Sequence, residues 1–441
     1  MNWKQLLSLQ RFGDTEIRHR HLQDETRLGF EVDYDRVIFS DSFRSLQDKT
    51  QVVPLSDADF VHTRLTHSLE VSVVGRTLGR IVGQQVLHRH PELVKDGYKF
   101  NDFGAIVAAA ALAHDIGNPP FGHSGERAIG DFFKTGNGRQ YKIQLTAAQW
   151  EDLANFEGNA NGFRLLTESR QGVSGGLRLS YATLGAFMKY PKISVPVKKT
   201  NHIAEKKFGV FQTDVPFFKE LSTALGLQPI RKDELVYYRH PLAYLVEAAD
   251  DICYSIIDFE DGINLGLISE DKALEYLLNL VRENLIKEKY NALKTQKDRV
   301  SYLRALAIQS LIFEAAAVFI EHEDAILQGN FPHALLDKCR FEAQLTDIIN
   351  ISVDKIYKSK EVVEKEINGY RVLTNLLNVF TSAINRDYEG KATGFDRLVL
   401  SLLPDEYRIF KDSLYERLMG ICSFIAGMSD RYAILLNDKI G

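Results

Sequence analysis

Apolar residues recur at every third or fourth position along most of the chain, and regular alternation of apolar and polar residues is scarce. The clearest stretch runs from Leu65 to Val86, where apolar side chains share one side and Arg76, Arg80 and Gln84 lie elsewhere. A period of about 3.6 residues is typical of an amphipathic helix, whereas alternation is typical of a strand. The pattern therefore predicts an all-α fold with at most a short β-hairpin.

Two further segments have the character of core helices. Residues Phe103 to Ala113 are alanine-rich and apolar nearly all round, as in a helix buried inside a bundle. Pro119 and Pro120 follow soon after, and proline cannot continue the hydrogen-bond ladder of a helix. A helix is also predicted from Pro241 to about Glu260, and Gly262 is expected to help end it.

Between about residues 130 and 240 the helical pattern is less regular, and the short pieces 195–197 and 209–212 predict the hairpin. From about residue 266 onward the pattern is helical again. No Gly/Ser-rich or Pro-rich linker separates independent units. We therefore expect a core formed by residues 1–265 and a C-terminal helical region, residues 266–441, packed on it.

The composition is that of a folded globular protein. The 441 residues are 45% hydrophobic and 26% charged, which excludes collagen-like and low-complexity architectures. There are 54 Lys and Arg against 59 Asp and Glu, and the net charge of -5 excludes a uniformly basic nucleic-acid coat while allowing a local basic groove. Any site for an anion must therefore be built locally.

We expect a cytoplasmic protein. Cys253, Cys339 and Cys422 are far apart and lack CxxC spacing, so neither a disulfide framework nor a thiolate zinc site is expected. The first residues contain no apolar stretch of signal-peptide length, and the longest apolar run is roughly half of what a membrane crossing needs. We therefore expect neither export nor a membrane span.

His67, the adjacent pair His114 and Asp115, and the distant Asp250 interrupt predicted apolar helices. Burying ionisable groups there is costly unless they are paired or bound to a cation. Imidazole nitrogens and carboxylate oxygens suit zinc, manganese, iron or a magnesium-like ion, and four such ligands leave positions open for water and substrate. These four residues are the candidate ligands of a catalytic metal, although a hydrogen bond alone would explain the adjacent pair.

The order and approximate spacing of these residues resemble the H…HD…D signature of the HD-domain metal phosphohydrolases. Flanking segments, spread over residues 30 to 265, resemble more specifically the bacterial dGTP triphosphohydrolase-like (dGTPase-like) branch. The segments are FRSLQDKTQV at 43–52, RLTHS at 64–68, AHDIGNPPFGH at 113–123, FEGNA at 156–160 and EAADD at 247–251.

From the residues alone, a divalent ion with nearby cations indicates only a phosphohydrolase. The resemblance implies attack at the α-phosphorus of a dNTP, with dGTP the expected substrate, and release of the deoxynucleoside and inorganic triphosphate. It also implies one divalent metal ion per subunit, either Mg or Mn or another transition metal such as Fe, Co, Ni or Zn.

His123 and Glu126 come just after the two prolines and are three residues apart. If a helix begins there, both side chains share one face, and the carboxylate can orient the imidazole for proton transfer. The resemblance implies the same catalytic role for this pair. A cap cluster at a helix N-terminus is the simpler structural explanation.

Asp250, Tyr254 and Asp258 recur at intervals of four residues and so share one stripe of the predicted helix. The resemblance implies that Tyr254 packs on the deoxyribose at C2′ and excludes ribose. It further implies that Asp258 binds the 3′-hydroxyl, with Gln51 as a second partner. Without the resemblance, Tyr254 fits a core aromatic and Asp258 a solvated charge equally well.

Arg64 precedes His67 by three residues and so lies on the same helical face, within reach of a metal-bound phosphate. Lys189 and Tyr190, which are followed by Pro191, match the family's Lys-Tyr-Pro phosphate-binding element. A lone Lys or Arg is commonly just a surface charge, and that interpretation stays open for both cations.

Lys198, Lys199, Lys206 and Lys207 form a basic run that would attract nucleotides or single-stranded DNA, although a solvated loop is the interpretation we favour. Some members of the family respond to single-stranded DNA (ssDNA) or to dNTP effectors, so such an effector is an expected partner beside the dNTP substrate. The resemblance also implies a homo-oligomer, hexamer or tetramer, with sites near the subunit interfaces.

Two other functions remain open at this stage. One is an HD-domain nucleotide phosphodiesterase or nucleotidase, which the cationic reach of Arg64 and Lys189 disfavours. The other is a nucleotide- or ssDNA-binding regulator without turnover, which the presence of His123 and Glu126 disfavours. Asn161 stands where the family often has Gln, and Ser45 and Asp48 are also unusual, so base preference is the weakest inference.

Overall fold

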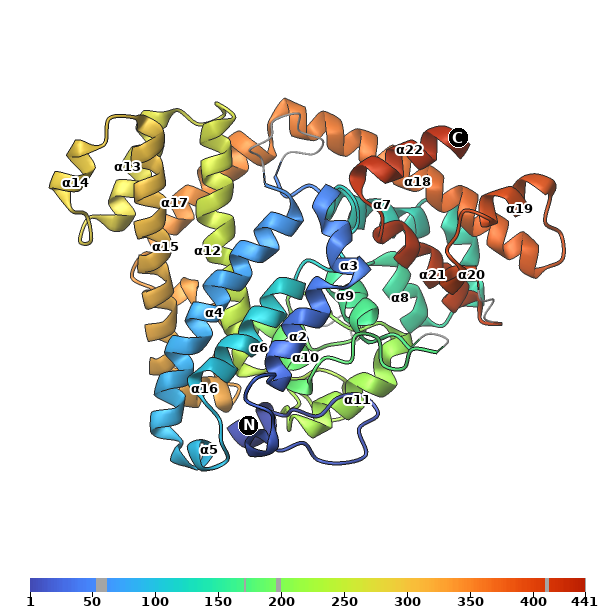
Figure 1. Cartoon of the computed structure of the whole chain (residues 1–441). Helices are drawn as coiled ribbons and strands as arrows, with labels where there is room; N and C mark the ends of the chain where they lie inside the picture. Colours follow the sequence, from blue (N-terminus) through green and yellow to red (C-terminus); the bar gives the residue numbers. More distant parts are fainter. Residues whose placement is uncertain (53–61, 170–171, 196–199, 409–411, 441) are drawn as a thin grey trace.

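The computed structural model describes residues 1–52, 62–169, 172–195, 200–408 and 412–440 (Figure 1). The fold is all-α, as the apolar pattern predicts, and the described residues form isolated β-bridges but no sheet. The helices of the first half are α1 (Trp3–Leu6), α2 (Gly29–Ile38), α3 (Asp41–Arg44), α4 (Arg64–Arg89), α5 (Pro91–Lys95), α6 (Phe100–Ala113), α7 (Gly122–Lys134), α8 (Ala147–Ala154), α9 (Gly158–Thr167), α10 (Tyr181–Phe187) and α11 (Val215–Ala224).

The second half continues in the same way. Its helices are α12 (Pro241–Asn264), α13 (Glu270–Val281), α14 (Lys287–Ala292), α15 (Gln296–Glu321), α16 (Glu323–Leu327), α17 (Glu342–Ser352), α18 (Lys360–Tyr388), α19 (Gly394–Leu400), α20 (Asp405–Arg408), α21 (Leu414–Ala426) and α22 (Asp430–Ile440). Short turns of 3-10 or π helix lie between them; two recur below, η2 (Ser45–Asp48) and the π-helical η7 (Val353–Tyr357).

The three predicted helices form as α4, α6 and α12, each a few residues longer than its apolar pattern indicated. The prediction that Gly262 ends the third helix is wrong, because α12 continues to Asn264 and the left-handed glycine, Gly266, comes later. A Cβ on Gly262 would lie 2.4 Å from Cδ1 of Ile356. This glycine therefore allows close packing of η7 on α12 instead of terminating the helix.

Helices α4 and α6 pack against each other along much of their lengths and form the centre of the molecule. Glycines on α4 make this possible: a Cβ on Gly79 would lie 2.6 Å from the carbonyl oxygen of Phe103, and one on Gly83 would lie 2.7 Å from its ring. Such contacts are too short for any side chain, so the two backbones approach closely only because these positions are glycine.

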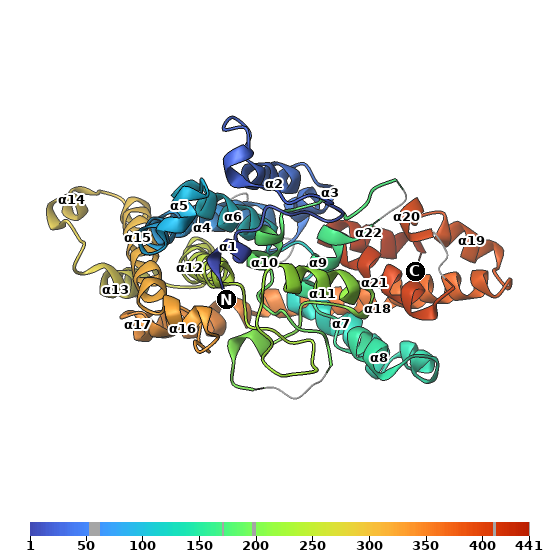
Figure 2. The same cartoon turned by 90° about the horizontal axis from the view of Figure 1, so that it is seen from below.

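Buried apolar side chains form two clusters. The first joins α1, α2, α4, α6, α10, α12, α13 and α15, and the second joins α7, α8, α18, α21 and α22. Figures 1 and 2 show α13 to α17 on one side of the central helices and α18 to α22 on the other. Residues after 265 thus contribute to both clusters, and the domain boundary at that residue stays a prediction.

The irregular segment before α12 differs in detail from the predicted hairpin. Ile193 and Val210 form a single bridge, but its direction is parallel, and Lys192 pairs with Val236 instead. A hairpin requires antiparallel neighbours, so the described residues do not form the one we expected. Residues 196–199, including Lys198 and Lys199 of the basic run, lie outside the described part of the chain.

One described helix, α15, is long and apolar enough to cross a membrane by length and composition alone, and the bent pair α21 and α22 would count as a second such segment. Half of the most apolar window of α15 is buried within the protein, and the helix packs on α4, α12 and α13. The core helices of globular proteins share this length and composition, so these properties are weak evidence for a membrane span.

Candidate active site

The four candidate metal ligands, far apart in the sequence, lie together in the structure. His67 lies in the first turn of α4, His114 and Asp115 follow α6, and Asp250 projects from α12. One ligand atom from each of His67, His114 and Asp115 lies within 4.8 Å of the others. Oδ1 of Asp250 is 3.1 Å from Nε2 of His67 and 3.3 Å from Nε2 of His114.

Local structure fixes the orientation of the two imidazoles. A capping box starts α4, in which the Thr63 side chain accepts from the backbone N–H of Thr66 and the Thr66 hydroxyl accepts from that of Thr63. At the end of α6, Nδ1 of His114 lies 2.7 Å from the carbonyl oxygen of Ala111. Nδ1 must donate this bond, so Nε2 keeps its lone pair for a metal.

The loop after Asp115 turns at Gly117, which has a φ of 103°. A Cβ there would lie 2.2 Å from the backbone nitrogen of Gly162 on α9, so only glycine fits. The turn therefore folds the HD loop directly against α9 and holds His114 and Asp115 in place.

The donor set suits a divalent cation. Oδ2 of Asp115 is buried and has no hydrogen-bond partner among the described residues, so a full acceptor is available there. Burial alone would raise the pKa of Asp115, but the Arg64 and His114 charges lower it to about 2. Burial opposes ionisation of Asp250 in the same way, yet Lys189 and the two imidazoles hold its pKa well below its usual value. Both carboxylates are therefore anionic and can bind a metal together with the two imidazoles.

Arg64 connects the metal cluster with α7. Its Nη1 donates to Oδ1 of Asp115 at 2.7 Å, and Asn118 donates to the same oxygen at 2.6 Å. Its Nη2 lies 3.0 Å from where a Cβ of Gly122 would be, at the first residue of α7. The guanidinium thus lies between Asp115 and the helix that carries His123, and its role toward phosphate stays a prediction.

His123 and Glu126 form the expected pair on the first turns of α7. Nδ1 of His123 lies 2.8 Å from Oε2 of Glu126, and the other carboxylate oxygen accepts from the backbone N–H of Gly158 at 2.8 Å. Burial tends to raise the pKa of Glu126, but His123 and Lys207 lower it to about 2. The buried carboxylate is anionic and fixes the imidazole, whose ring is 80% exposed and open to a ligand.

Lys207 contradicts our interpretation of the basic run as a solvated loop. Its Nζ lies 3.1 Å from Glu157 and 3.8 Å from Glu126, and its side chain is only 30% exposed. Lys206, the neighbouring residue, is exposed. Spacing could not reveal this contact, because Lys207 is 50 residues from Glu157 and pairs with it only through the fold.

The stripe on α12 contacts an aromatic partner that the sequence did not reveal. Tyr254 stacks on Tyr357 of η7 with ring centroids 5.6 Å apart and planes 5° apart. The Tyr357 hydroxyl donates to Oδ2 of Asp258 at 2.7 Å, whereas Oδ1 of Asp258 is buried and has no partner among the described residues. Burial raises the pKa of Asp258 to about 7, although the nearby charge of His67 opposes this. A free acceptor thus lies beside the metal cluster.

Gln51, Lys189 and Tyr190 lie in three different environments. Gln51 is half-buried, and its Oε1 has no partner among the described residues. Nζ of Lys189 donates to Oδ2 of Asp250 at 2.5 Å, so this cation reaches the metal cluster. Tyr190 is buried, and the Arg239 guanidinium lies 5.4 Å from its ring centroid. The contacts of Tyr190 are therefore those of a packing residue, and its role toward phosphate stays a prediction.

The C-terminal helices also reach the site, which the sequence did not indicate. Nζ of Lys49 donates to the carbonyl oxygens of Asn118, at 2.6 Å, and of Ala426 at the end of α21, at 2.7 Å. Asp430, the first residue of α22, accepts from the backbone N–H groups of Phe121 and Thr50 at 3.0 and 3.2 Å. The α21–α22 corner therefore holds the HD loop and the start of α7 in place.

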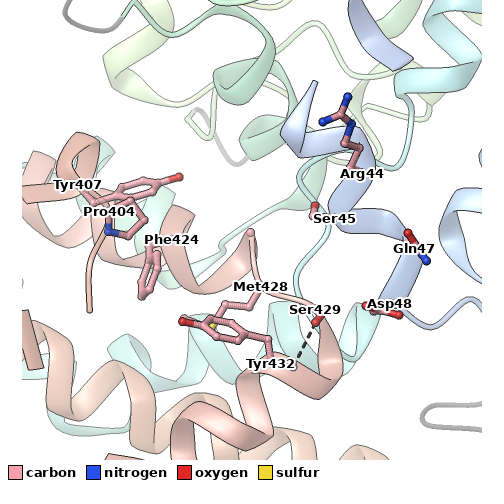
Figure 3. A pocket seen from close by; sticks show the side chains of 11 residues that line it. Arg44, Ser45, Gln47, Asp48, Pro404, Tyr407, Phe424, Met428, Ser429 and Tyr432 are labelled. Atoms are coloured by element: carbon pink, nitrogen blue, oxygen red, sulfur yellow. Dashed lines mark hydrogen bonds between the residues drawn. The ribbon is translucent and has the colours of Figure 1, made fainter. Parts of the chain in front are cut away.

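The surface of this corner is hollowed into a pocket of about 360 Å³ between η2 and the last helices (Figure 3). Tyr407, Phe424 and Tyr432 line it from the C-terminal side, and Arg44 and Asp48 line it from the other. Lys49 follows directly on Asp48, so the pocket and the HD loop contact the same short segment.

Comparison with known proteins gives consistent results. A family described as "HD domain" matches residues 64–156. The chain is 39% identical to a deoxyguanosinetriphosphate triphosphohydrolase-like protein of Synechocystis sp., over 100% of the chain and 99% of that protein. It is 40% identical to a protein of the same name from Pseudomonas aeruginosa, over 98% and 97%. A deoxyguanosinetriphosphate triphosphohydrolase of Yersinia pestis is 29% identical over 98% and 97%.

Proposed function

The chain belongs to the HD-domain deoxyguanosinetriphosphate triphosphohydrolase-like family, a family of metal-dependent nucleotide hydrolases, and on this basis we propose that it is a dNTP triphosphohydrolase. The proposed reaction is attack of water on the α-phosphorus, with cleavage of the bond to the 5′ oxygen. The products are the deoxynucleoside and inorganic triphosphate. We propose dGTP as the preferred substrate, in line with the names of the relatives.

One observation supports this proposal above the others. The stripe of α12 that provides Asp250 to the metal cluster continues through Tyr254 to Asp258, and both face the C-terminal Tyr357. A metal centre suited to phosphate and an aromatic, carboxylate-bearing surface suited to a sugar are thus adjacent on one helix. A nucleoside phosphate ester presents the same two groups next to each other.

A divalent ion held by His67, His114, Asp115 and Asp250 would polarise a phosphoryl oxygen as a Lewis acid. The chain's own cations would bind the rest of the triphosphate. Arg64 already spans from Asp115 to α7, Lys189 reaches Asp250, and Lys207 lies beside Glu126. Each of these cations is paired with a carboxylate, and each would donate hydrogen bonds from its remaining N–H groups to the phosphate oxygens.

Proton transfer would fall to His123. With Nδ1 held by the Glu126 carboxylate, the exposed Nε2 is oriented to pass a proton to the departing 5′ oxygen. Glu126 cannot rotate freely, because the N–H of Gly158 holds its second oxygen. The pair is therefore oriented before substrate binds.

Sugar selection would come from Tyr254 and Asp258. The stack with Tyr357 restricts movement of the Tyr254 ring, which would leave no room for a 2′-hydroxyl. Oδ1 of Asp258, which has no partner in the described part of the chain, is available with Gln51 to accept from a 3′-hydroxyl. This arrangement favours a deoxynucleoside over a ribonucleoside.

The wider assignment follows the resemblance. We propose a homo-oligomer, hexamer or tetramer, in the cytoplasm, which contains one divalent ion per subunit and responds to a dNTP or ssDNA effector. Size-exclusion chromatography with light scattering, with and without a second dNTP, tests the assembly.

The reaction itself is tested by incubating purified protein with Mn²⁺ or Mg²⁺ and each dNTP or rNTP in turn, then separating the products. We expect deoxynucleoside and intact triphosphate, with dGTP turned over fastest. Orthophosphate or pyrophosphate as the product would contradict the assignment. A His123→Ala variant as active as wild type would remove the role proposed for that residue.

A further inference from the structure

Arg239, two residues before α12, has one of the largest fully buried side chains in the described part of the chain. The segment that carries it runs beside the segment that follows Lys189, because the backbone N–H of Tyr237 donates to the carbonyl oxygen of Pro191 at 3.0 Å. A guanidinium is costly to bury unless its charge is paired and its N–H groups have acceptors. The partners of Arg239 therefore show what its buried charge holds in place.

Glu247 pairs with Arg239 through both of its carboxylate oxygens. Nη1 of Arg239 lies 2.5 Å from Oε2 of Glu247, and Nη2 lies 3.0 Å from Oε1. This two-point contact fixes the plane of the guanidinium. Glu247 lies on α12 three residues before Asp250, so the two carboxylates are neighbours on the surface of that helix. The pair thus joins Arg239 to the helix that provides a candidate metal ligand.

The remaining N–H of the guanidinium is directed at Lys189. Nε of Arg239 donates to the carbonyl oxygen of Lys189 at 2.5 Å, and Nζ of the same lysine donates to Oδ2 of Asp250 at 2.5 Å. The guanidinium carbon lies 5.4 Å from the ring centroid of Tyr190 and 5.3 Å from that of Tyr244. Lys189 is therefore attached to α12 twice, by its backbone through Arg239 and by its ammonium through Asp250.

Stability alone is a weak explanation for this arrangement. A buried ion pair adds little net stability, because the cost of desolvation offsets the attraction between the charges. Lys189 lies in a bend after α10, outside any helix, where a bond to its carbonyl oxygen restricts the backbone. The Arg239 side chain is 0% exposed and cannot contact a ligand, so any effect on substrate must pass through Lys189.

We propose that Arg239 is a positioning residue for Lys189. It holds the backbone of that lysine against α12, so that the ammonium stays beside Asp250, where a phosphate bound at the metal cluster can be reached. The proposal rests on the phosphate-binding role proposed above for Lys189. A lysine at position 239 could still pair with Glu247, but its compact ammonium lacks the planar fork that serves two partners at once.

A double-mutant cycle tests the proposal, with Arg239→Lys, Lys189→Ala and the combination of both. Steady-state kinetics with dGTP give kcat and KM, and isothermal titration at one fixed Mg²⁺ concentration gives the affinity for inorganic tripolyphosphate. Because a phosphate contact contributes to ground-state binding, Arg239→Lys should raise KM and weaken tripolyphosphate binding at least about tenfold, with a smaller change in kcat. In the Lys189→Ala background the same substitution should change either quantity by less than about twofold.

Arg231→Lys is the matched control. Arg231 also pairs with a buried carboxylate, that of Glu205 at 2.6 Å, but it forms no bond to Lys189 within the described residues, so KM and affinity should stay unchanged. Arg239→Met combined with Glu247→Leu covers the case in which Arg239→Lys does not fold. It leaves no unpaired buried charge, and it should show the same loss and the same dependence on Lys189.

Two results would overturn the proposal. One is an effect of Arg239→Lys that is equally large with and without Lys189, since Arg239 would then act only on the fold. The other is unchanged KM and tripolyphosphate affinity in the Arg239 variants. Tripolyphosphate binding that Lys189→Ala leaves unchanged would refute the phosphate role of Lys189 and this proposal with it. Products other than triphosphate, with the coupling between Arg239 and Lys189 intact, would refute only the reaction proposed above.

Discussion

Replacing Asp430 with Asn tests whether the C-terminal corner positions the catalytic helix. Asp430 is 1% exposed, and its two oxygens accept from the backbone N–H groups of Phe121 and Thr50 and from the Thr50 hydroxyl. Phe121 has a φ of 61° and directly precedes α7, so this bond holds an uncommon backbone conformation next to His123.

An Asn side chain has one acceptor oxygen where Asp has two, so one backbone N–H would lose its partner. A hydrogen bond to a charged group contributes about 1.5–3 kcal/mol, and a buried donor left unpaired adds a penalty of similar size. We therefore expect the free energy of unfolding to fall by about 3 kcal/mol. If the start of α7 shifts by even about 1 Å, kcat should fall by on the order of 100-fold while KM changes little.

The assay combines chemical denaturation with steady-state kinetics. Asp438→Asn is the matched control, because Asp438 lies on the same helix but is exposed. Asp430→Glu keeps the charge and should recover part of kcat. If Asp430→Asn and Asp438→Asn were equally stable and equally active, the corner would have no positioning role and this reasoning would be refuted.

Three further changes test separate parts of the account. Asp250→Ala should reduce metal content, measured by elemental analysis, from about one ion per chain to near zero, whereas Asp405→Ala at an exposed position should not; undiminished metal would exclude Asp250 as a ligand. Tyr254→Ala should lower the ratio of kcat/KM for dGTP over GTP at least about tenfold, and an unchanged ratio would place the sugar gate elsewhere. Hydrogen bonds to Asp261 and Glu70 raise the pKa of His62 to about 10. Because this pKa is raised, protonated His62 stabilises the fold. The stabilisation is complete below the pKa of the unfolded chain, about 6.5, and is lost as the pH rises through about 10. His62→Gln should therefore cost about 3–5 kcal/mol at pH 6 but little above pH 10, and a cost independent of pH would contradict this ion pair.

The sequence was most informative where function depends on helical periodicity. The helices that became α4, α6 and α12 could be predicted from their apolar spacing, and His67, the HD pair and Asp250 stood out because each interrupts an apolar face. Their convergence could be expected only because burying such groups apart would be costly. The pairing of His123 with Glu126 followed from their separation on one helix.

The contacts that the sequence did not reveal join distant segments. Tyr357 reaches Asp258 across 99 residues, and Lys49 reaches the carbonyl of Ala426 across 377. The sequence around Tyr357 and Lys49 resembles that around ordinary core or surface residues. Their partners come from the tertiary fold, so the neighbouring sequence could not indicate them. The prediction that Gly262 ends α12 failed for a related reason. Packing against Ile356 requires a glycine at this position, and the local sequence cannot distinguish such a glycine from one that ends a helix.

The most direct test of the central claim is hydrolysis of dGTP in ¹⁸O-labelled water, followed by mass spectrometry of both products. Attack at the α-phosphorus predicts one ¹⁸O atom in the inorganic triphosphate and none in the deoxyguanosine, with no reaction when the metal is removed. Label in the 5′-hydroxyl of deoxyguanosine, or release of labelled orthophosphate or pyrophosphate, would contradict the reaction proposed for this site.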